Sequence, residues 1–138
     1  MGVTYEKVQY LSENIEEAQV DADCIRAAID RLHRKVNLYK YGLVVSPDSR
    51  NRVNQYMMRY IYRFAQPKLC RVQDILNPVM DEKLCATIRQ QNVLIIDDVT
   101  TSGSTLNEIL RTLRILNEDN EITIFSLIGR KDLMAEAV

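Results

Sequence analysis

The sequence predicts an α/β fold, a three-layer parallel sheet with helices on both faces. Apolar runs of about five residues alternate along the chain with amphipathic stretches of about fifteen, which is the pattern of a βαβ series. Such strands are buried on both sides and pair in parallel. Ligands of these folds bind beyond the carboxyl ends of the strands, so the residues that follow each strand are the first candidates for a site.

Length and composition favour a single globular domain. The chain has 138 residues, of which 46% are hydrophobic and 27% charged, and its formal net charge is −1. This balance gives no direct signal for a nucleic-acid or membrane partner. No apolar run approaches the ~20 residues of a membrane span. We expect one domain over residues 1–138.

The N-terminus and the cysteines favour a cytoplasmic protein. The first residues, MGVTYEKVQYLSENIEE, contain acids and no apolar signal core. Cys24, Cys70 and Cys85 form no CxxC pair, which is typical of reduced, packed thiols. The pattern of residues 3–20 fits a strand and a helix equally, so the sequence pattern leaves the structure of this region open.

The first clear helix begins near Asp21, a suitable N-cap, and runs to about Lys35. A short strand, Tyr41–Val45, follows and ends in the turn Ser46-Pro47-Asp48-Ser49. The remaining expected elements follow in order: a helix over 53–64 that ends before Pro67, a strand at 68–72, a helix over 81–89 within the connection 74–91, a strand at 92–96, a helix over 104–116 and a strand at 121–127.

The most informative stretch is VLIIDDVTTSGSTL, from Val93 to Leu106. Its loop consists of small residues: Thr101, Ser102, Gly103, Ser104 and Thr105. A glycine permits close backbone approach, and backbone N–H groups at a helix start attract anions, phosphate above all. An ordinary helix cap is the alternative reading, since Ser and Thr are common there. The stretch is not a Walker loop, because no Lys occurs from Val93 to Asn120.

Two acids, Asp97 and Asp98, precede this loop. Paired carboxylates beside a phosphate site would repel a bare anion, but they suit a ligand that offers hydroxyls or a divalent cation. A sugar phosphate does so, with its phosphate in the loop and its ring hydroxyls on the acids. The alternative is that one or both aspartates cap turns.

The stretch resembles the signature of type I phosphoribosyltransferases, which bind phosphoribosyl pyrophosphate (PRPP). VLIIDDVTTSGSTL matches that signature throughout, with Ser102 in place of the usual second Thr. The resemblance implies a type I phosphoribosyltransferase-like core. It also implies that residues 101–105 hold the 5-phosphate and that Asp97 and Asp98 contact the ribose hydroxyls. Mg²⁺ would be held through PRPP and not directly by the protein, with Asp97 or Asp98 as the alternative contact. Residues 1–20 would be either the family's hood over the base or an N-terminal extension.

A second resemblance covers VVSPDSRNRVNQYM, from Val44 to Met57. It is similar to ComF-type members of the family, in which Arg residues and an Asn-Gln pair follow a Pro-containing turn. The resemblance implies a pyrophosphate-binding turn made of Ser46, Pro47, Asp48, Ser49 and Arg50, together with Arg52. An arginine beyond a strand end suits a doubly charged leaving group, although a solvated helix start explains it equally well.

Together these resemblances imply a phosphoribosyltransferase that transfers ribose 5-phosphate from PRPP to a base or amine and releases pyrophosphate. The segment that would close over pyrophosphate, 73–91, is short and holds only Lys83 and Arg89 as cations. The zinc-ribbon-like start of many ComF-type proteins is absent from this sequence. The alternative is therefore a PRPP-binding regulatory or accessory protein without turnover.

A phospho-acceptor receiver domain also carries an LIIDD-like strand end, but its acids follow the first strand. Here the acids come late, and the next strand ends in Ile128-Gly129-Arg130 without an aspartate, which excludes that fold. We expect His33 to be a surface residue without a catalytic role. The Tyr- and Met-rich helix near 51–65 predicts a homodimer, because exposed apolar surface marks interfaces.

Overall fold

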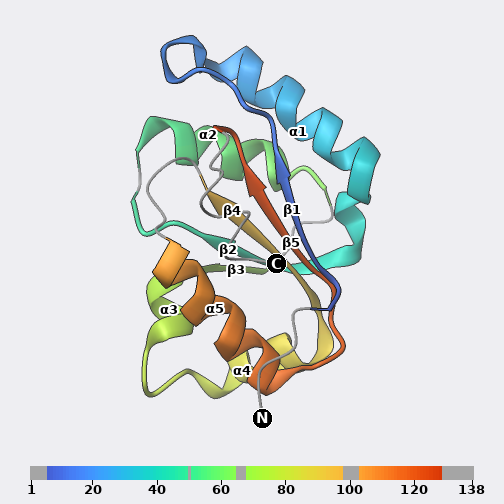
Figure 1. Cartoon of the computed structure of the whole chain (residues 1–138), viewed down its shortest axis with the longest axis vertical. Helices are drawn as coiled ribbons and strands as arrows, with labels where there is room; N and C mark the ends of the chain where they lie inside the picture. Colours follow the sequence, from blue (N-terminus) through green and yellow to red (C-terminus); the bar gives the residue numbers. More distant parts are fainter. Residues whose placement is uncertain (1–5, 50, 65–67, 98–102, 129–138) are drawn as a thin grey trace.

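The computed structural model describes residues 6–49, 51–64, 68–97 and 103–128, which form a five-stranded sheet flanked by helices (Figure 1). The strands are β1 (Val8–Ser12), β2 (Tyr41–Ser46), β3 (Lys68–Arg71), β4 (Asn92–Asp97) and β5 (Ile122–Ser126). The helices are α1 (Ala22–Val36), α2 (Arg52–Ile61), α3 (Val72–Leu76), α4 (Glu82–Gln90) and α5 (Gly103–Leu116), with 3-10 turns at Glu17–Gln19 and Leu38–Lys40.

The strand order is β1-β5-β4-β2-β3, and every pairing is parallel. The predicted α/β class and parallel sheet are therefore confirmed. The strand that precedes the aspartates, β4, lies in the middle of the sheet between β2 and β5. A central position places its carboxyl end where the segments after both neighbouring strands can reach it.

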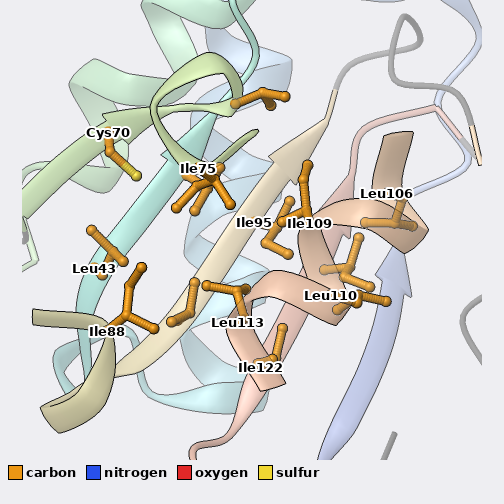
Figure 2. Close-up of a cluster of buried hydrophobic side chains, with 14 of the residues drawn as sticks. Leu43, Cys70, Ile75, Ile88, Ile95, Leu106, Ile109, Leu110, Leu113 and Ile122 are labelled. Carbon is orange, nitrogen blue, oxygen red and sulfur yellow. The ribbon is translucent and has the colours of Figure 1, made fainter. Parts of the chain in front are cut away.

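Helices pack on both faces because side chains along each strand alternate between two cores. In β4, Val93 and Ile95 belong to the cluster formed with α3, α4 and α5, which Figure 2 shows. Leu94 and Ile96 belong to the cluster formed with α1 and α2. Figure 1 shows these two groups of helices on opposite sides of the sheet.

The boundaries of α1 follow the predicted capping. The side chain of Asp21 accepts a hydrogen bond from the backbone N–H of Cys24 at 2.7 Å, as expected of an N-cap. The helix ends at Asn37, whose φ of 52° is in the left-handed region that terminates helices. Capping therefore fixes both ends of the helix that covers one face of the sheet.

Two segments differ from the sequence-based expectation. Residues 8–12 form the edge strand β1, paired with β5 in the register Val8↔Ile122, so this part of the N-terminal region belongs to the sheet. The strand expected over 68–72 ends at Arg71, and Val72 begins the short helix α3, which was not predicted. A carboxylate oxygen of Asp74 accepts the backbone N–H of Arg71 at 2.8 Å, and this cap turns the chain into a helix.

Within the described ranges, no helix has both the length and the apolar character needed to cross a bilayer.

Candidate functional site

The carboxyl ends of β2 and β4 lie at the same edge of the sheet. The two strands are parallel neighbours, with Val45 opposite Ile95, so Ser46 and Asp97 are the last residues of adjacent strands. Ser46, where the turn begins, and Asp97 therefore lie at neighbouring positions on this edge of the sheet. This is the arrangement expected if both segments contribute to one ligand site.

Asp97 is buried at the end of β4, with a fractional exposure of 1%. Its backbone carbonyl accepts a hydrogen bond from Leu127 N–H at 3.4 Å, and it lies opposite Ser126 in β5. By the alternation along the strand, its side chain points to the α3–α5 side of the sheet. The second acid, Asp98, lies outside the described residues.

The expected phosphate loop is described only at its end. Thr101 and Ser102 lie outside the described residues, and α5 begins at Gly103. Ser104 is exposed and Thr105 half-buried, both in the first turn of this 14-residue helix. The start of an α-helix carries partial positive charge and unpaired N–H groups, so these two hydroxyls lie where an anion is favoured.

The expected pyrophosphate turn is held against β3 and α3. The hydroxyl of Ser46 donates to the backbone carbonyl of Cys70 at 3.3 Å. A carboxylate oxygen of Asp48 accepts the backbone N–H of Gln73 at 3.2 Å, so this acid serves as an anchor for the turn. Pro47 and Ser49 complete the described part of the turn, and Arg50 lies outside it.

Arg52 begins α2, immediately after its N-cap, Asn51. Its guanidinium carbon lies 5.8 Å from the ring centre of Tyr56, one turn further along the same helix. The Arg52 side chain is exposed. The structure thus places it on the outer surface of α2, beside the turn and not inside it.

A pocket of about 440 Å³ opens between this turn, α2 and β3. It is lined by Ser46, Pro47, Ser49, Asn54, Gln55, Met58, Leu69, Cys70, Arg71 and Asp74. Most of these residues lie in α2, β3 and α3, and the sequence did not single them out as site residues. Asn54 and Gln55 form the Asn-Gln pair of the second resemblance, and Asn54 also interrupts the apolar stripe of α2 that contains Met57 and Ile61.

Asn54 is the buried polar residue beneath the turn, with a fractional exposure of 3%. Its side-chain N–H donates to the backbone carbonyl of Ser49 at 2.9 Å, and its backbone N–H donates to the side chain of Asn51 at 2.9 Å. The amide oxygen of Asn54 is also buried and accepts no hydrogen bond from the described residues. An unused buried acceptor costs free energy, so this conformation of the turn is not fully relaxed.

Cys70 is buried at the back of the same pocket. Burial raises the pKa of its thiol to about 12, so the sulfur is a neutral thiol at physiological pH. A neutral thiol is a poor nucleophile and a poor metal ligand. Cys70 therefore acts as a packing residue, and Cys24 and Cys85 are half-buried free thiols.

His33 is half-buried, not fully at the surface as expected, and its contacts are structural. Its Nδ1 accepts the backbone N–H of Leu38 at 3.0 Å. Its ring stacks on Phe64 with centroids 4.3 Å apart and meets Tyr39 edge-on at 5.1 Å. These contacts hold the end of α1 against the segment after α2, which explains the histidine without a catalytic role.

In the described part of the chain, no group of three or more His, Cys, Asp or Glu side chains is arranged to hold a metal ion. The described carboxylate at the end of β4 is that of Asp97.

Comparison with known proteins does not identify a family. A scan against protein-family models gives no match, and a search of curated proteins finds no related sequence.

Proposed function

We propose that this protein is a Mg²⁺-dependent phosphoribosyltransferase with a type I core. It would transfer ribose 5-phosphate from PRPP to a base or amine and release pyrophosphate. One observation carries the proposal: the signature stretch begins at Asp97, the last residue of the central strand β4 beside β2, and it ends in the first turn of α5. The sequence signature thus begins at the carboxyl edge of the sheet, where ligands of α/β folds bind.

The residues at this edge suit the chemistry of PRPP. Ser104 and Thr105, in the first turn of α5, would bind the 5-phosphate together with the helix terminus. Asp97 and Asp98 would meet the ribose hydroxyls. Their negative charge would favour the positive charge that develops on the ribose ring as pyrophosphate leaves.

Mg²⁺ fits this set because it prefers oxygen ligands and usually retains phosphate or water oxygens in its shell. When bound, it would offset the charge of the pyrophosphate leaving group. Asp97 or Asp98 would be its protein contact, and PRPP would supply the other oxygens. The described residues lack a cluster of metal-binding side chains, so we assign no separate metal site to them.

A PRPP-binding regulatory protein without turnover is the second candidate, and the segment 73–91 favours it. Phosphoribosyltransferases of this type close a mobile loop over pyrophosphate, but here the segment folds mostly into α3 and α4. Ile75, Leu84 and Ile88 from these helices are buried in the core (Figure 2 shows Ile75 and Ile88). Closure by this segment would have to expose those side chains, at a cost of about 1.5–3 kcal/mol for each.

Isothermal titration of PRPP with Mg²⁺ tests binding. Gly103→Val should abolish most of the affinity, because a β-branched side chain at the start of α5 obstructs backbone approach. Ser102→Ala should weaken binding less, by about 1.5–3 kcal/mol at most, because it removes one hydroxyl contact to a charged group. Thr112→Ala is the matched control, since it removes an exposed hydroxyl of α5 that bonds the Glu108 carbonyl away from the site.

Asp97→Asn and Asp98→Asn separate binding from turnover. An amide still bonds a ribose hydroxyl, so PRPP affinity should fall modestly, while pyrophosphate release in the presence of candidate bases should fall steeply. Wild type that binds PRPP without releasing pyrophosphate to any base or amine supports the regulatory candidate. Unchanged affinity in Gly103→Val would show that the stretch is a helix cap and that PRPP is not its ligand.

A further inference from the structure

The outer face of α2 carries an alternating series of arginines and aromatic rings. Arg52 and Arg59 lie seven residues apart, close to two helical turns, so they share one face. Tyr56 lies between them, and both guanidinium carbons are within 6 Å of its ring centre, at 5.8 Å and 5.6 Å. The ring of Tyr60 is nearly parallel to that of Tyr56, with an interplanar angle of 13° and centroids 6.4 Å apart.

The series continues past the end of α2. The guanidinium carbon of Arg63 lies 5.3 Å from the ring centre of Tyr60 and 5.4 Å from that of Phe64. Arg63 also pairs with Asp30 of α1 at 3.1 Å. We call Arg52, Tyr56, Arg59, Tyr60 and Arg63 the arginine–tyrosine stripe. It follows α2, the helix that packs beside α1 (Figure 1).

Two of these cations, Arg52 and Arg59, form no ion pair with any described residue. Helix α2 contains no Asp or Glu, and among the described residues no carboxylate lies within 4 Å of the Arg52 or Arg59 guanidinium. Two like charges therefore approach one tyrosine ring without compensation. Arg52 also lies in the first turn of α2, where the helix dipole disfavours a cation. An anion bound at this face would relieve both unfavourable interactions.

The charge of the chain is distributed unevenly. Residues 22–64, which include α1 and α2, hold nine Arg and Lys against three Asp, although the whole chain has a formal net charge of −1. Residues 103–128, which form α5, β5 and the connection between them, hold two Arg against four acids. A basic face on a chain with nearly balanced charge attracts polyanions to one side of the molecule.

The rings make the stripe more specific than a lysine-rich surface. Each guanidinium lies close enough to a tyrosine ring for a cation–π interaction, while its N–H edges stay available to phosphate oxygens. Tyr56 and Tyr60 are half-buried, so each still exposes part of its aromatic surface. Aromatic side chains interleaved with cations along one groove or face are the arrangement by which single strands are bound, bases on rings and phosphates on cations.

We propose that the arginine–tyrosine stripe binds single-stranded nucleic acid. The contacts are to phosphates and base faces, so the preference for sequence is weak. The proposal does not rest on PRPP binding, because the stripe lies on the outer surface of α2 and not in the edge between β2 and β4. An acidic protein or an anionic membrane is the competing partner, and the experiment separates these.

Fluorescence anisotropy with a labelled 20-nucleotide oligouridylate, at 50 mM and 200 mM salt, tests the proposal on the full chain. Wild type should bind at 50 mM salt and lose affinity several-fold at 200 mM, since bound phosphates release counterions. The double variant Arg52→Gln/Arg59→Gln should bind at least tenfold more weakly, and its slope of log affinity against log salt should be shallower by about two. All of these side chains are exposed, so the variants should fold.

The matched control is Arg89→Gln/Arg111→Gln, which removes the same charge from exposed positions of α4 and α5 on the other face. It should leave binding unchanged. Tyr56→Leu should weaken binding to oligouridylate more than to heparin, because heparin offers sulfates without bases. The proposal is wrong if wild type does not bind the oligonucleotide at 50 mM salt, or if the control double variant loses as much affinity. It is also wrong if heparin or phosphatidylserine vesicles show the same dependence on Tyr56.

Discussion

The two ends of the sheet differ in how completely their buried polar groups are hydrogen-bonded. At the amino end, Arg114 of α5 is 2% exposed, and its guanidinium donates to the backbone carbonyls of Asn117 at 3.4 Å and Asn120 at 2.9 Å. It also donates to the side chain of Asn120 and to the carbonyl of Glu6 at 2.6 Å. At the carboxyl end, buried Asn54 keeps an amide oxygen that no described residue uses.

The neighbours of Arg114 extend this amino-end network across the molecule. The side chain of Asn120 donates to the carbonyl of Gln91 at 3.2 Å, and that of Asn117 donates to the carbonyls of Ile88 and Arg89 at 3.1 Å and 3.0 Å. The network therefore joins the end of α4, the end of α5 and Glu6, two residues before β1. Its donors bond to acceptors within the protein, which indicates a structural role.

The difference teaches where to look for a site. Burial of a charged guanidinium is tolerated only when its donors are satisfied, so the amino end is fixed before any ligand arrives. At the carboxyl end, the amide oxygen of Asn54 has no donor among the described residues, and the turn after β2 rests on this side chain. A segment with an unused hydrogen-bond acceptor can rearrange when a ligand binds. Changes at the two ends should therefore have unequal effects.

The largest effect should come from Arg114→Leu. It removes a donor set that serves several carbonyls and leaves those oxygens buried, which should lower the free energy of unfolding by about 3–5 kcal/mol. Arg114→Lys retains the charge but not the planar fork, and should recover only part of the loss. Urea denaturation measures both variants. A loss below about 1 kcal/mol for Arg114→Leu would contradict the structural role of the network.

Alkaline pH should act on the carboxyl end through Cys70. Its pKa is raised to about 12 in the folded chain, so the unfolded chain loses the thiol proton at lower pH than the folded chain. The stability that the neutral thiol contributes is complete below the unfolded pKa near 9 and falls as pH rises toward 12; at pH 10 the loss is roughly 1.4 kcal/mol.

Comparison of wild type with Cys70→Val isolates the pH-dependent contribution of the Cys70 thiol to the unfolding free energy. From pH 8 to pH 10 the unfolding free energy of wild type should fall relative to that of Cys70→Val, because valine has no proton to lose. At pH 8, iodoacetamide should modify Cys24 and Cys85 before Cys70. Equal modification rates for the three cysteines would show that Cys70 is not buried as described.

Asn54→Leu should change stability much less than Arg114→Leu does. The substitution loses the hydrogen bond to the Ser49 carbonyl but also removes the unused acceptor and adds an apolar side chain to the core. These contributions oppose each other, so the unfolding free energy should stay within about 1 kcal/mol of wild type. The measurement is the same urea titration, and a loss as large as that of Arg114→Leu would end the contrast between the two ends of the sheet.

The smallest effect should come from the exposed pair Lys40–Glu121, which lies at the amino end with an N–O distance of 2.6 Å. The hydrogen bond to Glu121 raises the pKa of Lys40, and the same contact lowers that of Glu121. Both groups are open to solvent, so Lys40→Ala should cost less than about 1 kcal/mol, and 1 M salt should abolish the difference. A salt-independent cost would mean that Lys40 packs against Tyr41 and contributes little through its charge.

Much of the fold could be predicted because its signals are local. Asp21 caps α1 as expected, β2 and β4 each extend one residue past the predicted end, and α5 begins one residue early. Helix α3 was missed because five residues carry too little periodicity, and its start depends on the cap from Asp74. Strand β1 was ambiguous because its partner, β5, lies at the far end of the sequence.

The candidate site was less predictable than the fold. Two short sequence motifs indicated Asp97 and the turn after β2. The parallel order of β2 and β4 brings these two positions to the carboxyl edge of the sheet. The pocket beneath the turn depends on contacts between α2 and β3, which no local pattern encodes. The dimer expectation rested on apolar residues of α2, but Met57 and Ile61 are buried within the chain and Tyr56 and Tyr60 pack partly against the same core. The homodimer and the cytoplasmic location stay predictions.

The strand order also determines when each strand can find its partner during synthesis. Val8 of β1 pairs with Ile122 of β5, so the first strand to leave the ribosome has no partner until nearly the last one emerges. Until then Val8, Tyr10 and Leu11, which pack against the two cores of the finished sheet, are open to other chains. Contacts between residues so distant in sequence slow folding and lengthen this exposure. Among the described strands, β1 therefore waits longest for its partner during synthesis.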